Sequence, residues 1–199
     1  MKTVTRRLML AFCGSLAATP ALAQIGSILL GPKTIVEHAT ERRSFADQAK
    51  DNEIVLKVNA AMAKAGSASA STEIYEQRLL VTGLFDDKAK YDQFYAAVKA
   101  VAGVKKLYWH VVYESAADQK ADAKLLSWDK SLELATKAGA NITLAMKTAE
   151  QNYHVCADSF GTLYVIGRSL TKAEHDQALA SVRGTSGAKS VVDYVVVRP

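Results

Sequence analysis

The fold is specified mainly by two similar stretches, LLVTGLFDDKAKYDQFYAAVKAVAGVKKLYWHVVY at Leu79–Tyr113 and LYVIGRSLTKAEHDQALASVRGTSGAKSVVDYVVV at Leu163–Val197. They align without a gap, Leu79 opposite Leu163, and 13 of the 35 aligned pairs are identical. Similarity at a fixed spacing is the signature of a repeated structural unit. The sequence therefore predicts two copies of one small unit, one after the other along the chain.

Each copy is predicted to run in the order helix, strand, strand, helix, strand. The opening helices carry apolar residues at helical spacing, and the same alignment places Ile54 and Val58 opposite Ala138 and Ile142. Asp158–Gly161 has the composition of a hairpin turn. The expected strands are 72–77, 78–85 and 104–113 in the first copy, and 153–158, 162–168 and 190–197 in the second.

Four glycines recur at equivalent positions of the two copies. Gly83 and Gly167 interrupt the second strand of each copy, where glycine usually marks a bulge or the close approach of another element. We expect that element to be the second helix. Gly103 and Gly187 are expected to end the second helices in the left-handed conformation.

The predicted fold class is α+β, with two tandem units, each a three-stranded sheet with helices on one face. The final strands are apolar at nearly every position, whereas a sheet that is wetted on one side alternates. Each open face is therefore expected to be covered, by the other copy. The predicted boundaries are a lead-in at 24–50, a first unit at 51–114, a linker at 115–127 that is a loop or a helix continuous with 125–149, and a second unit at 128–199.

The N-terminal segment 1–23 has the pattern of a secretory signal peptide. Basic Lys2, Arg6 and Arg7 precede the apolar run Leu8–Leu16, and Ala21-Leu22-Ala23 is a small-residue cleavage motif. Cleavage is expected between Ala23 and Gln24, by either the general or the twin-arginine export route. No later apolar run is long enough to span a bilayer. The sequence predicts a periplasmic protein that is soluble or peripheral at a membrane rather than transmembrane.

Charge and cysteine content exclude two further classes of protein. Removal of the signal peptide takes away three basic residues and no acidic ones, so the mature chain lacks the basic surplus that nucleic-acid phosphates require. Nucleic acid is therefore not an expected partner. Cys13 lies in the signal peptide, so Cys156 is the only cysteine that remains, and no intrachain disulfide is expected.

Two groups of residues are candidate sites. His154, Cys156 and Asp158 alternate along one predicted strand and are all metal-ligand types, although the same pattern fits a strand with polar residues and one packed thiol. We expect no metal there, and no catalytic role. Trp128, Lys130, Leu132 and Lys137 could form a helix that rests on an anionic membrane. The alternative is that Trp128 and Leu132 continue a core stripe toward Ile142.

The element order and its glycine motifs resemble the BON domain, named for bacterial osmotically inducible and nodulation proteins. The motifs are Val81-Thr82-Gly83 and Val165-Ile166-Gly167 in the second strands, and Gly103-Val104-Lys105-Lys106 and Gly187-Ala188-Lys189-Ser190 before the Val-rich final strands. The resemblance covers roughly residues 40–199 and is to periplasmic proteins with two BON domains.

The resemblance implies a protein without catalytic activity or cofactor. Such a protein binds phospholipid surfaces or envelope proteins and supports envelope integrity under osmotic stress. One rival is a periplasmic protein-interaction or chaperone-like stress factor without lipid affinity. A further rival is a metal or redox protein that uses His154 and Cys156.

Overall fold

A computed structural model describes residues 41–66, 70–146 and 151–199; the predicted signal peptide and most of the predicted lead-in lie outside the described residues. In the described part the fold is α+β, with five helices and two three-stranded sheets. The helices are α2 (Phe45–Lys64), α3 (Lys88–Lys99), α4 (Ala116–Ala121), α5 (Trp128–Met146) and α6 (Lys172–Arg183). The strands are β1 (Ala70–Tyr75), β2 (Arg78–Phe85), β3 (Lys106–Tyr113), β4 (Tyr153–Ala157), β5 (Thr162–Ser169) and β6 (Ser190–Val197).

The two sheets have the same topology. In each, the second strand lies in the middle, antiparallel to the first strand and parallel to the third. Gly83 pairs with Val111 on β3, and Gly167 pairs with Val195 on β6. Both pairings agree with the alignment of the repeat, so the two glycines occupy equivalent positions in the two sheets.

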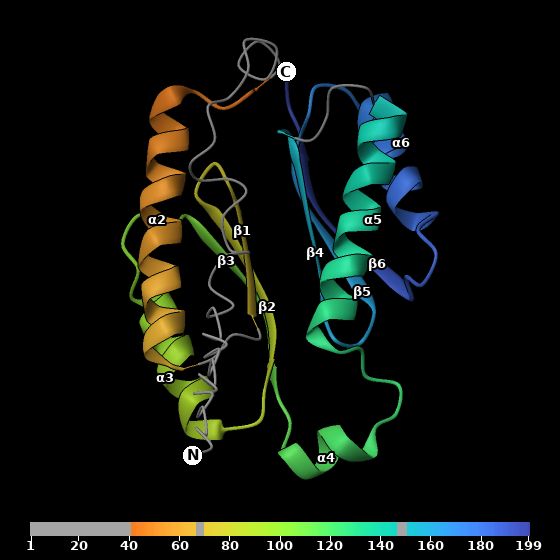
Figure 1. Ribbon diagram of the computed structural model, residues 1–199. Helices are drawn as coiled ribbons and strands as arrows, with labels where there is room; N and C mark the ends of the chain where they lie inside the picture. Colours follow the sequence, from red (N-terminus) through yellow and green to blue (C-terminus); the bar gives the residue numbers. More distant parts are fainter. Residues whose placement is uncertain (1–40, 67–69, 147–150) are drawn as a thin grey trace, which may run out of the picture.

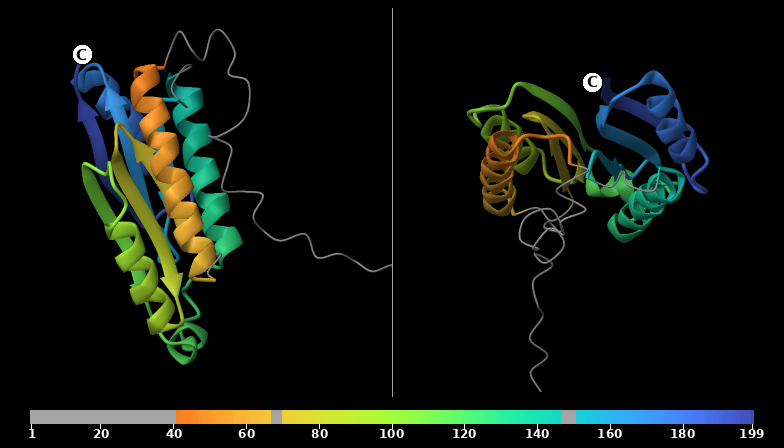
Figure 2. Two further views of the ribbon diagram at one scale, coloured as in Figure 1. Left: turned by 90° about the vertical axis from the view of Figure 1, so that its left-hand side faces the viewer. Right: turned by 90° about the horizontal axis from the view of Figure 1, so that it is seen from above.

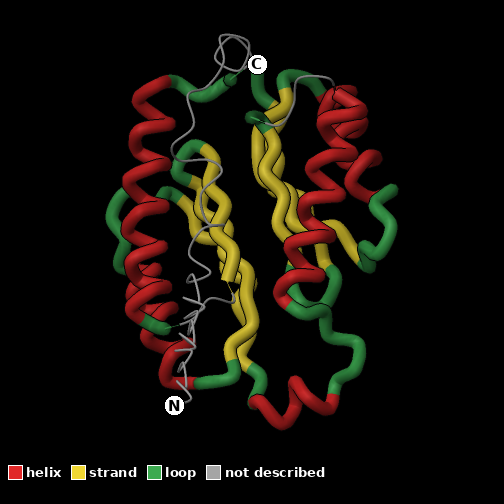
Figure 3. Tube along the Cα trace, in the orientation of Figure 1, coloured by secondary structure: helices red, strands yellow, loops and turns green. Residues whose placement is uncertain are grey.

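The molecule has four layers, helices outside and sheets inside (Figures 1 and 3). Helices α2 and α3 cover the outer face of the first sheet, and α5 and α6 cover the outer face of the second (Figure 2). The inner faces pack on each other through a cluster that includes Tyr75, Leu80, Cys156, Tyr164 and Ile166. The expectation that each half covers the open face of the other agrees with this packing.

The opening helices are matched one helical turn away from the expected alignment. The side chain of Ile54 approaches Gly103 and that of Leu134 approaches Gly187, which makes Leu134 the counterpart of Ile54. The expected pairing of Ile54 with Ala138 is therefore wrong. A shift of one turn leaves the same helix face directed inward, so the apolar stripe alone cannot distinguish the two alignments.

Two predicted boundaries also differ. Helix α2 begins at Phe45, before the predicted start at residue 51, because Ser44 caps it by accepting a hydrogen bond from the Asp47 amide. In the described end of the lead-in, Arg42 and Arg43 are held by several hydrogen bonds. The linker contains α4, which ends at Ala121 and is separate from α5.

The turn between β1 and β2 depends on a buried carboxylate. Glu76 and Gln77 both have positive φ angles, 53° and 64°, a conformation that is unfavourable for residues other than glycine. Asp51, only 1% exposed, accepts hydrogen bonds from the amides of both residues, at 2.9 and 2.7 Å. Asp51 thus stabilises a turn that the local sequence does not favour.

The structure confirms only part of what the sequence predicts for the glycines. Gly103 and Gly187 have positive φ, 93° and 96°, but they lie beyond the ends of α3 and α6, at Lys99 and Arg183. The expected neighbour of Gly167 is wrong. A Cβ atom there would lie 2.0 Å from the carbonyl oxygen of Asn152, so the backbone leading into β4, not helix α6, makes the close approach.

We predict that Gly167→Ala destabilises the protein by about 1–3 kcal/mol or more, because a backbone oxygen cannot move away as a flexible side chain can. Gly139→Ala on α5 is the matched control. Apart from the backbone of its own helix and its chain neighbours, no described atom lies within 4 Å of its added Cβ, and alanine favours the helix by roughly 0.5–1 kcal/mol. Urea unfolding of both variants measures the difference; equal stabilities would contradict the close approach.

Candidate functional site

The four residues predicted to contact lipid lie on α5 but not on one side of it. The buried stripe of α5 consists of Ser131, Leu134, Ala138 and Ile142. Trp128 and Leu132 are half-buried on the flank of this stripe, so they do not continue the core as the alternative required. Lys130 and Lys137 are exposed on the solvent side.

The two lysines are already paired with a carboxylate. Glu133 lies 2.8 Å from the Lys130 ammonium and 2.7 Å from the Lys137 ammonium. Their hydrogen bonds and charges lower the pKa of Glu133 to about 2.

Helix α2 carries the same pattern of charges. When Ile54 is matched with Leu134, Lys50, Glu53 and Lys57 fall opposite Lys130, Glu133 and Lys137. Lys57 and Glu53 lie 2.6 Å apart. The lysines of α5 therefore belong to a charge pattern, a lysine on either side of one glutamate, that both opening helices carry on their solvent side.

The three residues of the alternative metal site are occupied by structural contacts. Asp158 accepts hydrogen bonds from the amides of Phe160 and Thr162 and from the Tyr164 hydroxyl, at 2.9, 2.8 and 2.8 Å. It thereby closes the hairpin between β4 and β5. Within the part of the chain that the structure describes, no three His, Cys, Asp or Glu side chains are grouped as metal ligands.

Cys156 and His154 lie on the inner side of β4. Cys156 belongs to the cluster between the sheets, and its burial raises the pKa of the thiol well above the ordinary value. A thiol is nucleophilic as the thiolate, so this environment suppresses its reactivity. His154 Nδ1 lies 3.2 Å from Glu73 Oε2, an ion-pair distance whose geometry does not form a hydrogen bond. The ring of His154 also packs edge-on against Tyr75.

A second set of contacts joins the last strands of the two sheets, β3 and β6. His110 Nε2 on β3 lies 2.7 Å from the hydroxyl of Tyr194 on β6, and the ring of Tyr108 stacks on that of Tyr194 at 3.8 Å. The His110 ring also lies 4.3 Å from that of Tyr164. Burial lowers the pKa of His110 and outweighs the opposite effect of Asp158. The interface between the halves therefore favours the neutral form of His110.

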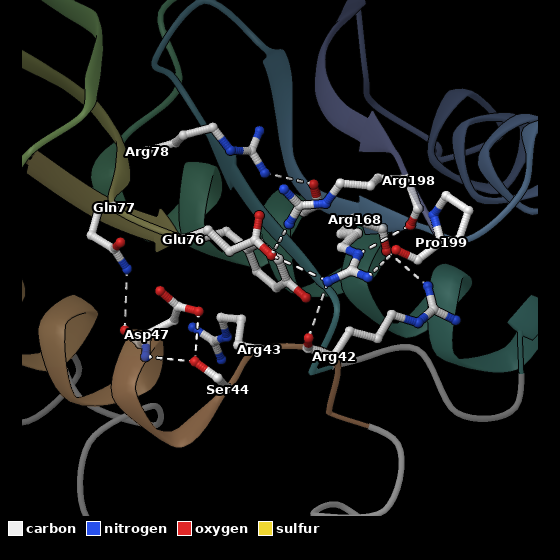
Figure 4. A network of polar contacts seen from close by, with 12 residues as sticks. Arg42, Arg43, Ser44, Asp47, Glu76, Gln77, Arg78, Arg168, Arg198 and Pro199 are labelled. Carbon is white, nitrogen blue, oxygen red and sulfur yellow. Dashed lines mark hydrogen bonds and ion pairs between the residues drawn. The ribbon is translucent and has the colours of Figure 1, made fainter.

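A network of arginines joins the halves at one end (Figure 4). Glu76, in the turn of the first half, binds Arg168 and Arg198 of the second half. Arg78 reaches across and donates to the carbonyl oxygens of Tyr194 and Gly167, at 2.6 and 2.8 Å. Sequence reasoning missed this network, because Glu76 and Arg78 have no distinctive spacing from the residues that they meet.

Sequence reasoning also missed a group of aromatic side chains on α3 and β3. Tyr91, Tyr95 and Trp109, which we call the aromatic surface, are half-buried or exposed and rest on buried Phe85 and Phe94. The ring of Tyr95 lies 4.9 Å from that of Trp109, and the Trp109 indole N–H donates to the Tyr91 hydroxyl at 3.2 Å. The signal in the sequence was the difference between the two copies at these positions.

Comparisons with known proteins add little. No family model matches the chain, and no curated protein matches it significantly. Two solved structures that it resembles are of CdsD, a structural protein of the type III secretion system of Chlamydia trachomatis. One, of the C-terminal domain, has 10% identity and a TM-score of 0.30, over 74% of this chain and 98% of that one. The other has 11% identity and a TM-score of 0.30, over 74% and 93%. Likeness this slight carries no inference about function.

Among the described residues, no helix combines the length and the apolar character that are needed to cross a membrane.

We predict that acid destabilises the interface through His110. Because its pKa is lowered in the folded state, the unfolded chain binds more protons below the ordinary value of 6.5, and stability falls as the pH drops through that range. Unfolding free energies measured at about pH 7 and about pH 5 should show a smaller loss for His110→Phe than for the wild type.

His175 supplies the control of opposite sign. Burial lowers its pKa, but hydrogen bonds and charge from Asp176 and Asp193 outweigh burial and raise it. Its stabilisation is therefore full below its unfolded pKa and is lost as the pH rises through its folded pKa. His175→Asn should increase the loss of stability in acid, and a decrease would show that the two histidines are assigned wrongly.

Proposed function

We propose that the protein is a non-catalytic periplasmic protein with two BON-like units that binds anionic phospholipid surfaces and supports the integrity of the envelope under osmotic stress. The repeated order of helix, strand, strand, helix and strand supports the BON-like organisation. The signal-like N-terminus supports export.

The observation that carries the lipid proposal is the character of the outer helices. Because the sheets cover each other, the helices and the strand edges form the outer surface. Large apolar side chains are exposed there: Leu56 on α2 is 60% exposed, and Tyr95 on α3, which is 37% exposed, lies one turn before Lys99. Exposed apolar and cationic side chains on one helix suit the boundary between headgroups and acyl chains.

The titratable groups inside the protein support binding rather than catalysis. Asp51 and Asp158 hold turns, and Cys156 is buried with a raised pKa. A general acid or nucleophile needs access to a substrate, and all three groups are buried. These three groups are poorly suited to either role in the folded protein.

We predict that the purified protein co-sediments with vesicles of phosphatidylglycerol and phosphatidylethanolamine at low salt, and not with vesicles of phosphatidylcholine alone. Binding should weaken as salt is raised, because charges on the surface are screened beyond about 10 Å at 0.1 M ionic strength. The amount of protein in the pellet measures both effects. Absence from the anionic vesicles at low salt would remove the lipid proposal.

The rival function, protein interaction without lipid affinity, is favoured by the edges of the sheets. β3 and β6 each pair with a single strand among the described residues, so their outer backbone groups can pair with an extended peptide. Asp193 occupies part of the β6 edge by accepting a hydrogen bond from the Val195 amide. A stoichiometric envelope protein recovered in a pull-down, with no binding to vesicles, would favour this rival.

A further inference from the structure

The two halves differ most where the first carries the aromatic surface. In the alignment that pairs the strand glycines, the counterparts of Tyr91, Tyr95 and Trp109 are His175, Leu179 and Asp193. Leu179 is buried, and His175 and Asp193 form an ion pair at 2.8 Å. The second half shows that the unit folds without aromatic rings at these positions. The aromatic surface of the first half is therefore not explained by the fold alone.

The buried rings under this surface and the more exposed rings on it have different roles. Phe85 and Phe94 stack at 5.5 Å and are buried, so they belong to the core of the first half. Tyr95 is 37% exposed, and Tyr91 and Trp109 are half-buried. The Trp109 ring contacts both buried Phe94 and exposed Tyr95. The rings are thus fixed by packing before any partner arrives.

Two lysines lie close to rings of the aromatic surface. The Lys88 ammonium lies 5.4 Å from the centre of the Tyr91 ring, and the Lys99 ammonium lies 5.8 Å from the centre of the Tyr95 ring. Lys88 also pairs with Asp92, but both side chains are more than half exposed, so solvent screens the pair.

Helix α3 and the residues around it are only slightly more basic than their counterparts in the second half. The segment 86–106 contains five lysines and three aspartates, whereas the equivalent segment 170–190 contains three basic and two acidic side chains. The attraction for anions therefore depends on where Lys88 and Lys99 lie, beside the rings, rather than on a large surplus of charge.

Tyrosine and tryptophan rings flanked by lysine match one environment in particular. Their apolar bodies and polar edges suit the headgroup layer of a bilayer, and ammonium groups at the rim attract anionic lipids. We propose that the aromatic surface, with Lys88 and Lys99, is where the protein contacts an anionic phospholipid bilayer. This inference rests on the proposed function and places the contact on the first half rather than on α5.

The chain holds two tryptophans, one in each candidate site, so each can report on its own surroundings. In Trp128→Phe the fluorescence comes from Trp109, and the difference between the wild type and this variant gives the contribution of Trp128. The wild type and the variant are mixed with vesicles of phosphatidylglycerol and phosphatidylethanolamine, and quenching by acrylamide is measured. We expect Trp109 to shift to shorter wavelength and to be protected from acrylamide, while Trp128 is unchanged.

Three results would overturn the inference, and they separate it from the proposed function. If the protein co-sediments but only Trp128 becomes protected, lipid binding stands and the contact lies on α5. If neither the wild type nor Trp128→Phe co-sediments, both proposals fail. If Trp109 becomes protected when the protein is concentrated without vesicles, a second copy of the chain covers the aromatic surface instead.

Matched variants in the two halves test the surface without altering the reporters. Lys99→Gln removes an ammonium from the aromatic surface, and Arg183→Gln removes the charge at the equivalent position of the second half. One basic residue near an anionic membrane changes affinity by about fivefold. We expect Lys99→Gln to lose about fivefold in affinity for anionic vesicles and Arg183→Gln to lose less. Equal losses would show that general electrostatic attraction, and not the aromatic surface, determines binding.

Tyr95→Ser tests the ring itself. The side chain is exposed enough that circular dichroism should show an unchanged fold. We expect its binding to anionic vesicles to weaken severalfold. A folded Tyr95→Ser that binds as well as the wild type would overturn the role of the ring.

Discussion

The burial of the two inner sheet faces against each other is the constraint on which the rest of the structure depends. A three-stranded sheet with helices on one face leaves its other face open to water, and in both halves that face carries tyrosine and aliphatic side chains. Removing apolar area from water contributes roughly 25 cal/mol per Å². Neither half can obtain this contribution alone, because its own helices are on the outer side. The two halves therefore bury these faces only in contact with each other, although each repeats the topology of the other.

Polar groups between the halves fix how the faces meet. Arg78 supplies donors to two backbone oxygens of the other half, and Glu76 receives two arginines from it. The turn that presents Glu76 is held by Asp51, which also lies 3.2 Å from the guanidinium of Arg43. Apolar packing alone is non-directional, whereas these contacts are satisfied at a single relative position. The chain segment before α2 thus contributes to the orientation of the halves.

The repeat made much of this fold predictable, and its irregularities mark where prediction failed. The strands β2, β3, β5 and β6 follow the aligned stretches, because alternating and Val-rich runs have a fixed register once the glycines are matched. The predicted alignment of the two opening helices was wrong by one turn, because an apolar stripe repeats every three to four positions of a helix. The first strands shift by one position against the rest of the repeat, because the hairpin after β4 is longer than the turn after β1. The candidate site on α5 was selected by residue type, and helix geometry then divided its tryptophan from its lysines. No pattern within one copy indicated the aromatic surface, which becomes visible only when Trp109 is compared with Asp193.

The stacking of Tyr108 on Tyr194 joins residues that are not equivalent in the two halves. Two identical units that associate about a two-fold axis must present a surface that complements itself. In a single chain with two units, each surface needs only to match the other, and the two can differ. Tyr108 has valine as its counterpart at position 192, and Arg78 has threonine at position 162. Each half is therefore a complement of the other half and not of itself, and neither could take the place of the other at the interface.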